Sequence, residues 1–233
     1  MYSRVQKMCS VLLKSVVIIS AVAGTFLSAY SGRNSFMGGR VVFMYFTIQS
    51  NIAVALISAI GCYLLMKNPH PSDVWYRIKF VGTVSITLTG MVFCFVLAPT
   101  LGENAWNIQN ILTHVIVPMA AIADFFVTAT GADYRRKDVF WVILPPIAYA
   151  IYAGIGYVRG WQFAEGINYP YFFLNWGSPA GAFGFTDELP YMGCVWWIAL
   201  LMVFLIAVGY LYLKLAERIK NKVLGFKPLH SNI

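Results

Sequence analysis

Three polar side chains stand close together near the start of a long apolar stretch of this sequence. Thr47, Ser50 and Asn51 are spaced i, i+3 and i+4, which places them on one face of a helix. Polar groups inside a membrane segment are costly, so such a face needs partners or a function. A threonine hydroxyl there becomes a useful nucleophile only when a neighbouring base takes its proton.

His114 is the candidate base, because it is the only histidine that lies within an apolar segment. It shares a helical face with Asn107 and Asn110, which predicts a second polar face in the membrane. Pro118 has no N–H for the His114 carbonyl, so we expect a locally loosened backbone there that polar groups or water must satisfy. Neutral histidine accepts protons near pH 7, and Thr47 with His114 therefore forms a candidate catalytic dyad.

Neighbours of this dyad are candidate donors to a developing oxyanion. Asn51 and Asn110 carry amide N–H groups, and Ser50 is a supporting candidate with its hydroxyl. Such donors contribute roughly 3–4 kcal/mol each in known hydrolases. The dyad residues also have a purely structural interpretation, because membrane threonines usually bond the carbonyl four residues back and many membrane histidines only join helices.

Asp124 is a poor candidate for a third catalytic residue. It lies ten residues past His114, which is about 15 Å along a helix, and it is turned roughly 80° away from that face. We expect it to pair instead with a basic loop residue such as Arg135 or Arg136. The sequence therefore favours a dyad over a triad.

Composition places the chain among integral membrane proteins. Of its 233 residues 59% are hydrophobic and only 11% are charged. Several apolar runs reach the ~20 residues that cross a bilayer. We predict an all-α fold with a single six-helix transmembrane domain over residues 1–233. The expected helices are 10–30, 41–66, 75–97, 105–128, 139–158 and 191–213, followed by a basic tail over 214–233.

Basic residues predict the orientation of these helices. Most of the 17 lysines and arginines fall on one side of the membrane, and the exceptions are Arg33, Arg40 and Arg159. This bias predicts cytoplasmic termini, in what we expect to be a bacterial plasma membrane. Because the charges lie in short loops and a juxtamembrane tail, the net charge of +8 indicates lipid headgroups as partners, and no nucleic acid.

The predicted orientation brings Thr47 and His114 to a similar depth. Both of their helices enter the membrane from the non-cytoplasmic face. Thr47 lies seven residues beyond Arg40, and His114 lies nine residues beyond Ala105. At 1.5 Å per residue these separations are about 10 Å and 13 Å. The two residues are therefore expected to share one depth, in the outer half of the bilayer.

The segment between the last two predicted helices, residues 159–190, is long and rich in aromatic residues, glycine and proline. Loops of this length are often lids or partly re-entrant segments. The four cysteines show no metal-ligand spacing, and no metal or organic cofactor is expected. A bridge between Cys94 and Cys194 stays open, because sequence alone does not establish pairing.

Short motifs carry a family resemblance across most of the chain. FTIQSN at 46–51, NILTHVIVP at 110–118 and YPYFF at 169–173 resemble the androgen-induced, FAR-17a-like family of intramembrane threonine hydrolases. The resemblance implies Thr47 as nucleophile, His114 as base, and fatty acid esters of hydroxy fatty acids as the substrate class. The sequence departs from the family pattern at Asp124, where glutamate is usual, and in a Gly-rich segment at 177–184.

We therefore expect an intramembrane hydrolase that uses the Thr47–His114 pair on a lipid ester drawn from the membrane. Two alternatives stay open. One is a membrane acyltransferase that uses the same pair, and the other is a non-enzymatic small transporter or lipid-binding receptor whose polar faces line a solute path. The natural ester and the oligomeric state are not encoded in any motif of the chain.

Overall fold

Six helical segments of the described chain are long and apolar enough to cross a membrane. The computed structural model describes residues 2–31, 39–67 and 71–225. The candidate spans are Arg4–Tyr30, Phe46–Lys67, Asp73–Leu101, Ile108–Val127, Arg136–Val158 and Cys194–Val223. The predicted all-α, six-helix membrane fold is thereby confirmed.

Three spans are single helices, and three are composite. The single helices are α1 (Arg4–Ser31), α2 (Phe46–Lys67) and α8 (Cys194–Leu224). The third span consists of α3 (Asp73–Val92), a π-turn at Phe93–Leu97 and α4 (Ala98–Leu101). The fourth consists of α5 (Ile108–Ile111), a π-turn at Leu112–Ile116 and α6 (Val117–Val127). The fifth consists of a 3-10 helix at Arg136–Ile143 and α7 (Leu144–Val158).

Several helix ends differ from the predicted ones. The first helix begins at Arg4 instead of residue 10, and the second begins at Phe46 because Gly39–Met44 forms a 3-10 helix. The last helix continues to Leu224, so much of the predicted tail is helical. The remainder of that tail, 226–233, and Arg33 lie outside the described residues.

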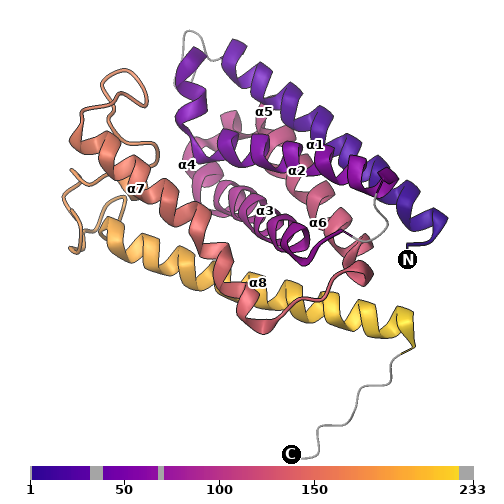
Figure 1. The fold of residues 1–233 in the computed structure, drawn as a ribbon. Coiled ribbons are helices and arrows are strands. Elements are labelled where there is room, and N and C mark those ends of the chain that lie inside the picture. The colour runs from indigo at the N-terminus through magenta and orange to yellow at the C-terminus, as the bar shows by residue number, and fades with distance from the viewer. Residues whose placement is uncertain (1, 32–38, 68–70, 226–233) are drawn as a thin grey trace, which may run out of the picture.

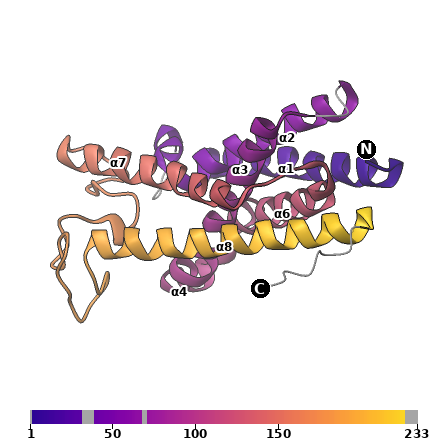
Figure 2. The same cartoon turned by 60° about the horizontal axis from the view of Figure 1, so that its bottom comes forward.

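Helices α1, α2, α3 and α6 form the inner group of the bundle. Both α1 and α3 pack against α2 and α6. Helices α7 and α8 lie along one side of this group, and the loop that joins them, 159–193, extends at the end of the bundle opposite the N-terminus (Figures 1 and 2). Buried apolar side chains such as Phe80, Phe125 and Leu205 connect α3, α6 and α8. This arrangement leaves the start of α2 beside the long loop.

The prolines mark where the composite spans change helix type. Pro145 and Pro146 occupy the first turn of α7, directly after the 3-10 helix Arg136–Ile143. Proline is tolerated in a first turn because those N–H groups have no intrahelical partner. The fifth span therefore changes from 3-10 to α geometry at these prolines.

Asp124 forms a buried ionic cluster with two lysines, which corrects the predicted pairing with Arg135 or Arg136. Lys14 Nζ lies 2.6 Å from Asp124 Oδ1, and Lys79 Nζ lies 2.6 Å from Asp124 Oδ2. All three side chains are buried in α1, α3 and α6. The two arginines are exposed beyond the end of α6, so the helices packed beside Asp124 supply its cations instead. The orientation predicted from basic residues places both lysines on the cytoplasmic side, whereas both are buried inside the bundle and do not report orientation.

Removing the charge of Asp124 should destabilise the bundle. Asp124→Asn leaves two buried ammonium groups without a counter-charge, and breaking a buried ion pair in this way costs about 3–5 kcal/mol. Thermal unfolding of the purified protein in detergent should show a clear fall in melting temperature. Asp133→Asn is the matched control, because Asp133 is largely exposed and pairs with Lys220 at the surface, where loss costs only ~0–1 kcal/mol. Equal melting temperatures for the two variants would contradict this assignment.

Candidate active site

Thr47 stands in the first turn of α2. Tyr45, just before the helix, is fully buried and donates its hydroxyl to the Phe163 carbonyl in the long loop, at 2.7 Å. The N–H of Thr47 is one of those at a helix start that lack an intrahelical partner. It donates instead to the Tyr171 hydroxyl at 3.3 Å. The loop between α7 and α8 therefore completes the start of α2.

His114 lies in the π-turn Leu112–Ile116. The Val117 N–H bonds to the Leu112 carbonyl, five residues back, which adds one residue to that turn. Pro118 follows directly, and its missing N–H explains why the regular helix is interrupted here. Where the sequence predicts a locally loosened backbone, the chain thus forms a π-turn. Turns of this kind occur frequently at functional sites.

The Thr47 and His114 side chains meet. Thr47 Oγ1 lies 3.3 Å from His114 Nε2, and both residues are buried. His114 Nδ1 lies 3.1 Å from the Asn110 carbonyl oxygen. Because a carbonyl oxygen only accepts hydrogen bonds, Nδ1 carries the hydrogen and Nε2 is the acceptor. The Thr47 hydroxyl therefore donates to the histidine, which is the direction that base catalysis requires.

A second π-turn supports the histidine from α3. Phe93, the first residue of the π-turn Phe93–Leu97, stacks on the His114 imidazole with ring centroids 3.9 Å apart and an interplanar angle of 18°. One turn earlier, Gly90 touches the same region. A β-carbon added at Gly90 would lie 2.8 Å from the His114 carbonyl oxygen and 3.2 Å from Pro118 Cγ. Glycine is required here because the two backbones approach too closely for a side chain.

The predicted oxyanion donors are nearby but bond elsewhere. Asn51 Nδ2 donates to the carbonyls of Thr47, at 2.8 Å, and Thr113, at 3.1 Å, which uses both of its amide hydrogens. The Asn110 amide donates to the Ala105 carbonyl at 2.9 Å. In each case the side-chain amide bonds to backbone carbonyl oxygens, and none of these hydrogen bonds is to Thr47 Oγ1.

Ser50 likewise has a positioning role in this structure. Its hydroxyl donates to the Thr47 carbonyl at 3.0 Å and lies 2.8 Å from Thr89 Oγ1 on α3. A single hydroxyl hydrogen cannot also serve an oxyanion while that bond is kept. The dyad predicted from sequence is brought together, whereas its predicted helpers hold the surrounding helices in place.

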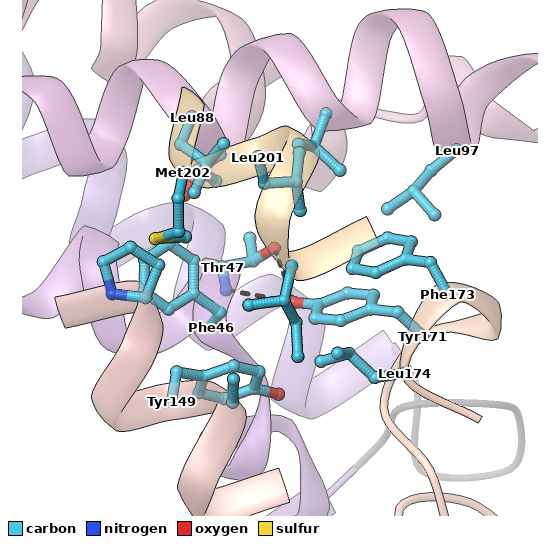
Figure 3. Close-up of a pocket in the computed structure, with 15 residues that line it drawn as sticks. Phe46, Thr47, Leu88, Leu97, Tyr149, Tyr171, Phe173, Leu174, Leu201 and Met202 are labelled. Carbon is cyan, nitrogen blue, oxygen red and sulfur yellow. Dashed lines mark hydrogen bonds between the residues drawn. The ribbon is translucent and has the colours of Figure 1, made fainter. Parts of the chain in front are cut away.

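Tyr171 is the residue that sequence reasoning missed. Its hydroxyl lies 3.4 Å from Thr47 Oγ1, and Figure 3 shows it directed at the threonine. The ring stacks on Phe173, with centroids 5.1 Å apart. Removal from water raises the pKa of the Tyr171 phenol, so it stays a neutral donor at physiological pH. In the sequence, the signal for Tyr171 is its place in the YPYFF motif of the family resemblance.

A narrow apolar cavity adjoins Thr47. It is lined from α2, α3, α7, α8 and the long loop, and its lining includes Phe46, Leu88, Tyr149 and Leu201 (Figure 3). Its volume is about 60 Å³. This space admits small molecules such as water, and an acyl chain would have to displace lining side chains to enter.

Two further findings bear on chemistry at this site. Within the ranges that the structure describes, no group of three His, Cys, Asp or Glu side chains is arranged to hold a metal ion. Cys94 and Cys194, along with Cys9 and Cys62, are free thiols. The predicted possibility of a bridge between Cys94 and Cys194 is therefore not realised in this structure.

Comparisons of the chain with known protein families, curated proteins and solved structures find no match. The resemblance to the FAR-17a-like family accordingly stays a prediction that rests on short motifs.

Substituting Gly90 tests the close approach of α3 to His114. Gly90→Ala should destabilise the protein by about 1–3 kcal/mol through overpacking against a backbone carbonyl. Gly82→Ala is the matched control on the same helix, because its β-carbon would meet only the flexible tip of Ile57. Alanine there should be neutral or stabilising by up to about 1 kcal/mol. Melting temperatures that rise equally in both variants would show that the packing at Gly90 is looser than described.

Proposed function

We propose that this protein is an intramembrane hydrolase of lipid esters in which Thr47 is the nucleophile and His114 the general base. The observation that carries the proposal is the 3.3 Å contact between Thr47 Oγ1 and His114 Nε2. The tautomer of the histidine supports it, because the Asn110 carbonyl leaves Nε2 as the acceptor. A buried hydroxyl paired with a correctly oriented base is the arrangement that nucleophilic catalysis needs.

The reaction proceeds in two halves. His114 Nε2 takes the Thr47 proton as Oγ1 attacks the ester carbonyl, and the imidazolium is stabilised by its Nδ1–H bond to the Asn110 carbonyl. Collapse of the tetrahedral intermediate expels the alcohol, which receives the proton from His114, and an acyl-threonine remains. Water then attacks the acyl group while His114 again removes a proton, and the acid leaves as Thr47 is reprotonated.

Tyr171 is the proposed donor to the oxyanion. Its hydroxyl is neutral, lies 3.4 Å from Thr47 Oγ1, and comes from outside the helix that carries the nucleophile. The N-terminal end of α2 adds a partial positive charge next to the same atom, which favours developing negative charge there. In this proposal Tyr171 replaces Asn51, Asn110 and Ser50 as the stabilising group.

The substrate class follows from the surroundings of the dyad. The cavity beside Thr47 is lined almost entirely by apolar side chains and belongs to a chain of six membrane spans. The apolar lining favours a membrane lipid ester, whose acyl chain enters by displacing lining side chains. Fatty acid esters of hydroxy fatty acids are one proposed group through the family resemblance. We place both termini in the cytoplasm of a bacterial cell, since basic residues gather near the N-terminus and the end of α8.

Labelling with a fluorophosphonate probe tests the nucleophile. Wild-type protein in detergent should be labelled on the peptide that contains Thr47, and Thr47→Ala and His114→Ala should each lose labelling and ester hydrolysis by at least about 10³-fold. Ser50→Ala is the control, because it removes the nearest other hydroxyl of α2. Label that persists in Thr47→Ala, or maps to Ser50, would refute the assignment. Turnover that requires an added alcohol would identify an acyltransferase instead.

Tyr171→Phe tests the oxyanion donor. The variant keeps the ring packing but loses the hydroxyl, and kcat for a long-chain ester should fall by roughly 10²–10³-fold with little change in KM. Tyr169→Phe serves as control, since Tyr169 belongs to the same motif but does not line the cavity at Thr47. If both variants keep wild-type kcat, Tyr171 only positions the start of α2.

A further inference from the structure

A second and larger cavity lies on the other side of Phe46 from the Thr47 site. It is a groove between α2, α3 and the beginning of the fifth span, with a volume of about 600 Å³. Phe46 contributes to the lining of both cavities. The groove is large enough for an acyl chain, which the cavity at Thr47 is not.

The rim of this groove is apolar and open. Val74 and Ile78 on α3, and Trp141 and Leu144 on the fifth span, are each about half exposed. In a membrane-spanning bundle such side chains face lipid. Access to the groove is therefore from the bilayer, and a chain of methylene groups can enter it without crossing water.

Two polar atoms of the groove lack hydrogen-bond partners. Ser85 is 5% exposed, and its Oγ has no partner. Arg77 Nε also has none, although it lies 3.1 Å from Asp138 Oδ1 as an ion pair. Buried polar groups without partners are rare in native structures, so each is a position where a polar atom of a ligand could bond.

Arg77 retains capacity to bind an anion beyond its ion pair. A guanidinium carries five N–H donors. Asp138 is buried and accepts the Arg135 N–H through its other oxygen, at 2.8 Å, so it cannot satisfy all of them. Asp138 thus holds Arg77 in place, while the Arg77 side chain as a whole stays 30% exposed. Arginine in this arrangement suits carboxylate or phosphate groups.

The positions of these residues fit one kind of occupant. Arg77 lies four residues after Asp73, where α3 begins, so it stands near the membrane surface. Ser85 is eight residues further on, which is about 12 Å deeper at 1.5 Å per residue. We propose that this groove binds a single-chain lipid with an anionic headgroup. The carboxylate or phosphate lies at Arg77, the chain runs past Gly82, and a polar atom of the lipid meets Ser85.

This binding site is independent of the proposed hydrolysis, because it involves neither Thr47 nor His114. Its occupant can be a free fatty acid or a lysophospholipid such as lysophosphatidate, which share an anionic head and one chain. The experiments below separate these two sources.

A photoreactive fatty acid tests the groove directly. Palmitic acid carrying a diazirine is irradiated with the full-length protein in nanodiscs of phosphatidylcholine, and crosslinks are mapped by mass spectrometry. Ala53 lines the groove and faces outward, so Ala53→Phe should reduce labelling roughly tenfold by filling the space. Ile52→Phe is the matched control, because Ile52 is its exposed neighbour and lies outside the groove. Crosslinks that map away from α2, α3 and 136–145, or equal labelling of both variants, would overturn the proposal.

The headgroup contact is tested by variants that preserve charge balance. Arg77→Gln combined with Asp138→Asn removes the guanidinium without leaving a buried lone carboxylate, and labelling should fall roughly tenfold. Arg136→Gln, an exposed arginine outside the groove, should leave labelling unchanged. Thr47→Ala should also label as wild type does, so failure of the hydrolase proposal and failure of this one are distinguishable.

Competition identifies the headgroup even if a variant fails to fold. Unlabelled palmitate and lysophosphatidate should both displace the probe if any anionic head is accepted, and only one of them if the site prefers carboxylate or phosphate. Methyl palmitate has the same chain without the charge, and it should compete at least tenfold less well. Equal competition by methyl palmitate would show that the groove merely holds a bilayer chain, which contradicts the proposal.

Discussion

The Asn51 amide is the interaction on which the rest of the candidate site depends. It donates to the Thr47 carbonyl in its own helix and to the Thr113 carbonyl in the π-turn opposite. In the membrane interior no water competes for these carbonyls, so a fully buried amide that bonds both of them fixes the two helices in register. The neighbouring hydroxyl and imidazole, on Thr47 and His114, are then held at hydrogen-bonding distance.

The backbone of the fourth span, which carries His114, is also constrained by the need to keep its polar groups hydrogen-bonded inside the membrane. Pro118 removes an N–H inside the membrane, and the chain responds with a π-turn that keeps most backbone groups bonded. The turn places His114 against Phe93 and lets Gly90 approach its carbonyl. The irregular backbone before Pro118 therefore belongs to the same packing that brings His114 Nε2 to Thr47 on α2.

Much of the fold was predictable because a membrane span requires a long run of apolar residues, which is visible in the sequence. Apolar runs of sufficient length specify spans almost directly, so the six helices were found, with errors mainly at their ends. The Thr47–His114 pair was predictable in the same way, since a polar residue inside an apolar run is conspicuous and its position sets its depth. The resulting contact did not depend on exact helix ends. Although Gly39–Met44 is a 3-10 helix instead of part of the second span, the two residues still meet.

The predictions that were wrong concern side chains that could form ion pairs or hydrogen bonds with several different partners. Lys14 and Lys79 lie near the ends of apolar runs, so their charge suggested loops, whereas both are buried against Asp124. Asn51 and Ser50 lie on the predicted helix face, but they donate their hydrogens to backbone carbonyls and are not free to act as oxyanion donors. Tyr171 comes from a loop without periodicity, and no spacing rule relates it to Thr47. Tertiary packing decides each of these cases, and sequence patterns do not report it.

Trapping an acyl intermediate is the sharpest test of Thr47 as the nucleophile. Purified protein is mixed with excess long-chain p-nitrophenyl ester, quenched in acid within the first turnover, and analysed by tandem mass spectrometry. We expect one acyl group on Thr47 of the wild-type protein and none on Thr47→Ala, with release of p-nitrophenol falling in parallel. Ester hydrolysis that continues in Thr47→Ala, or an acyl group found on any other residue, would contradict it.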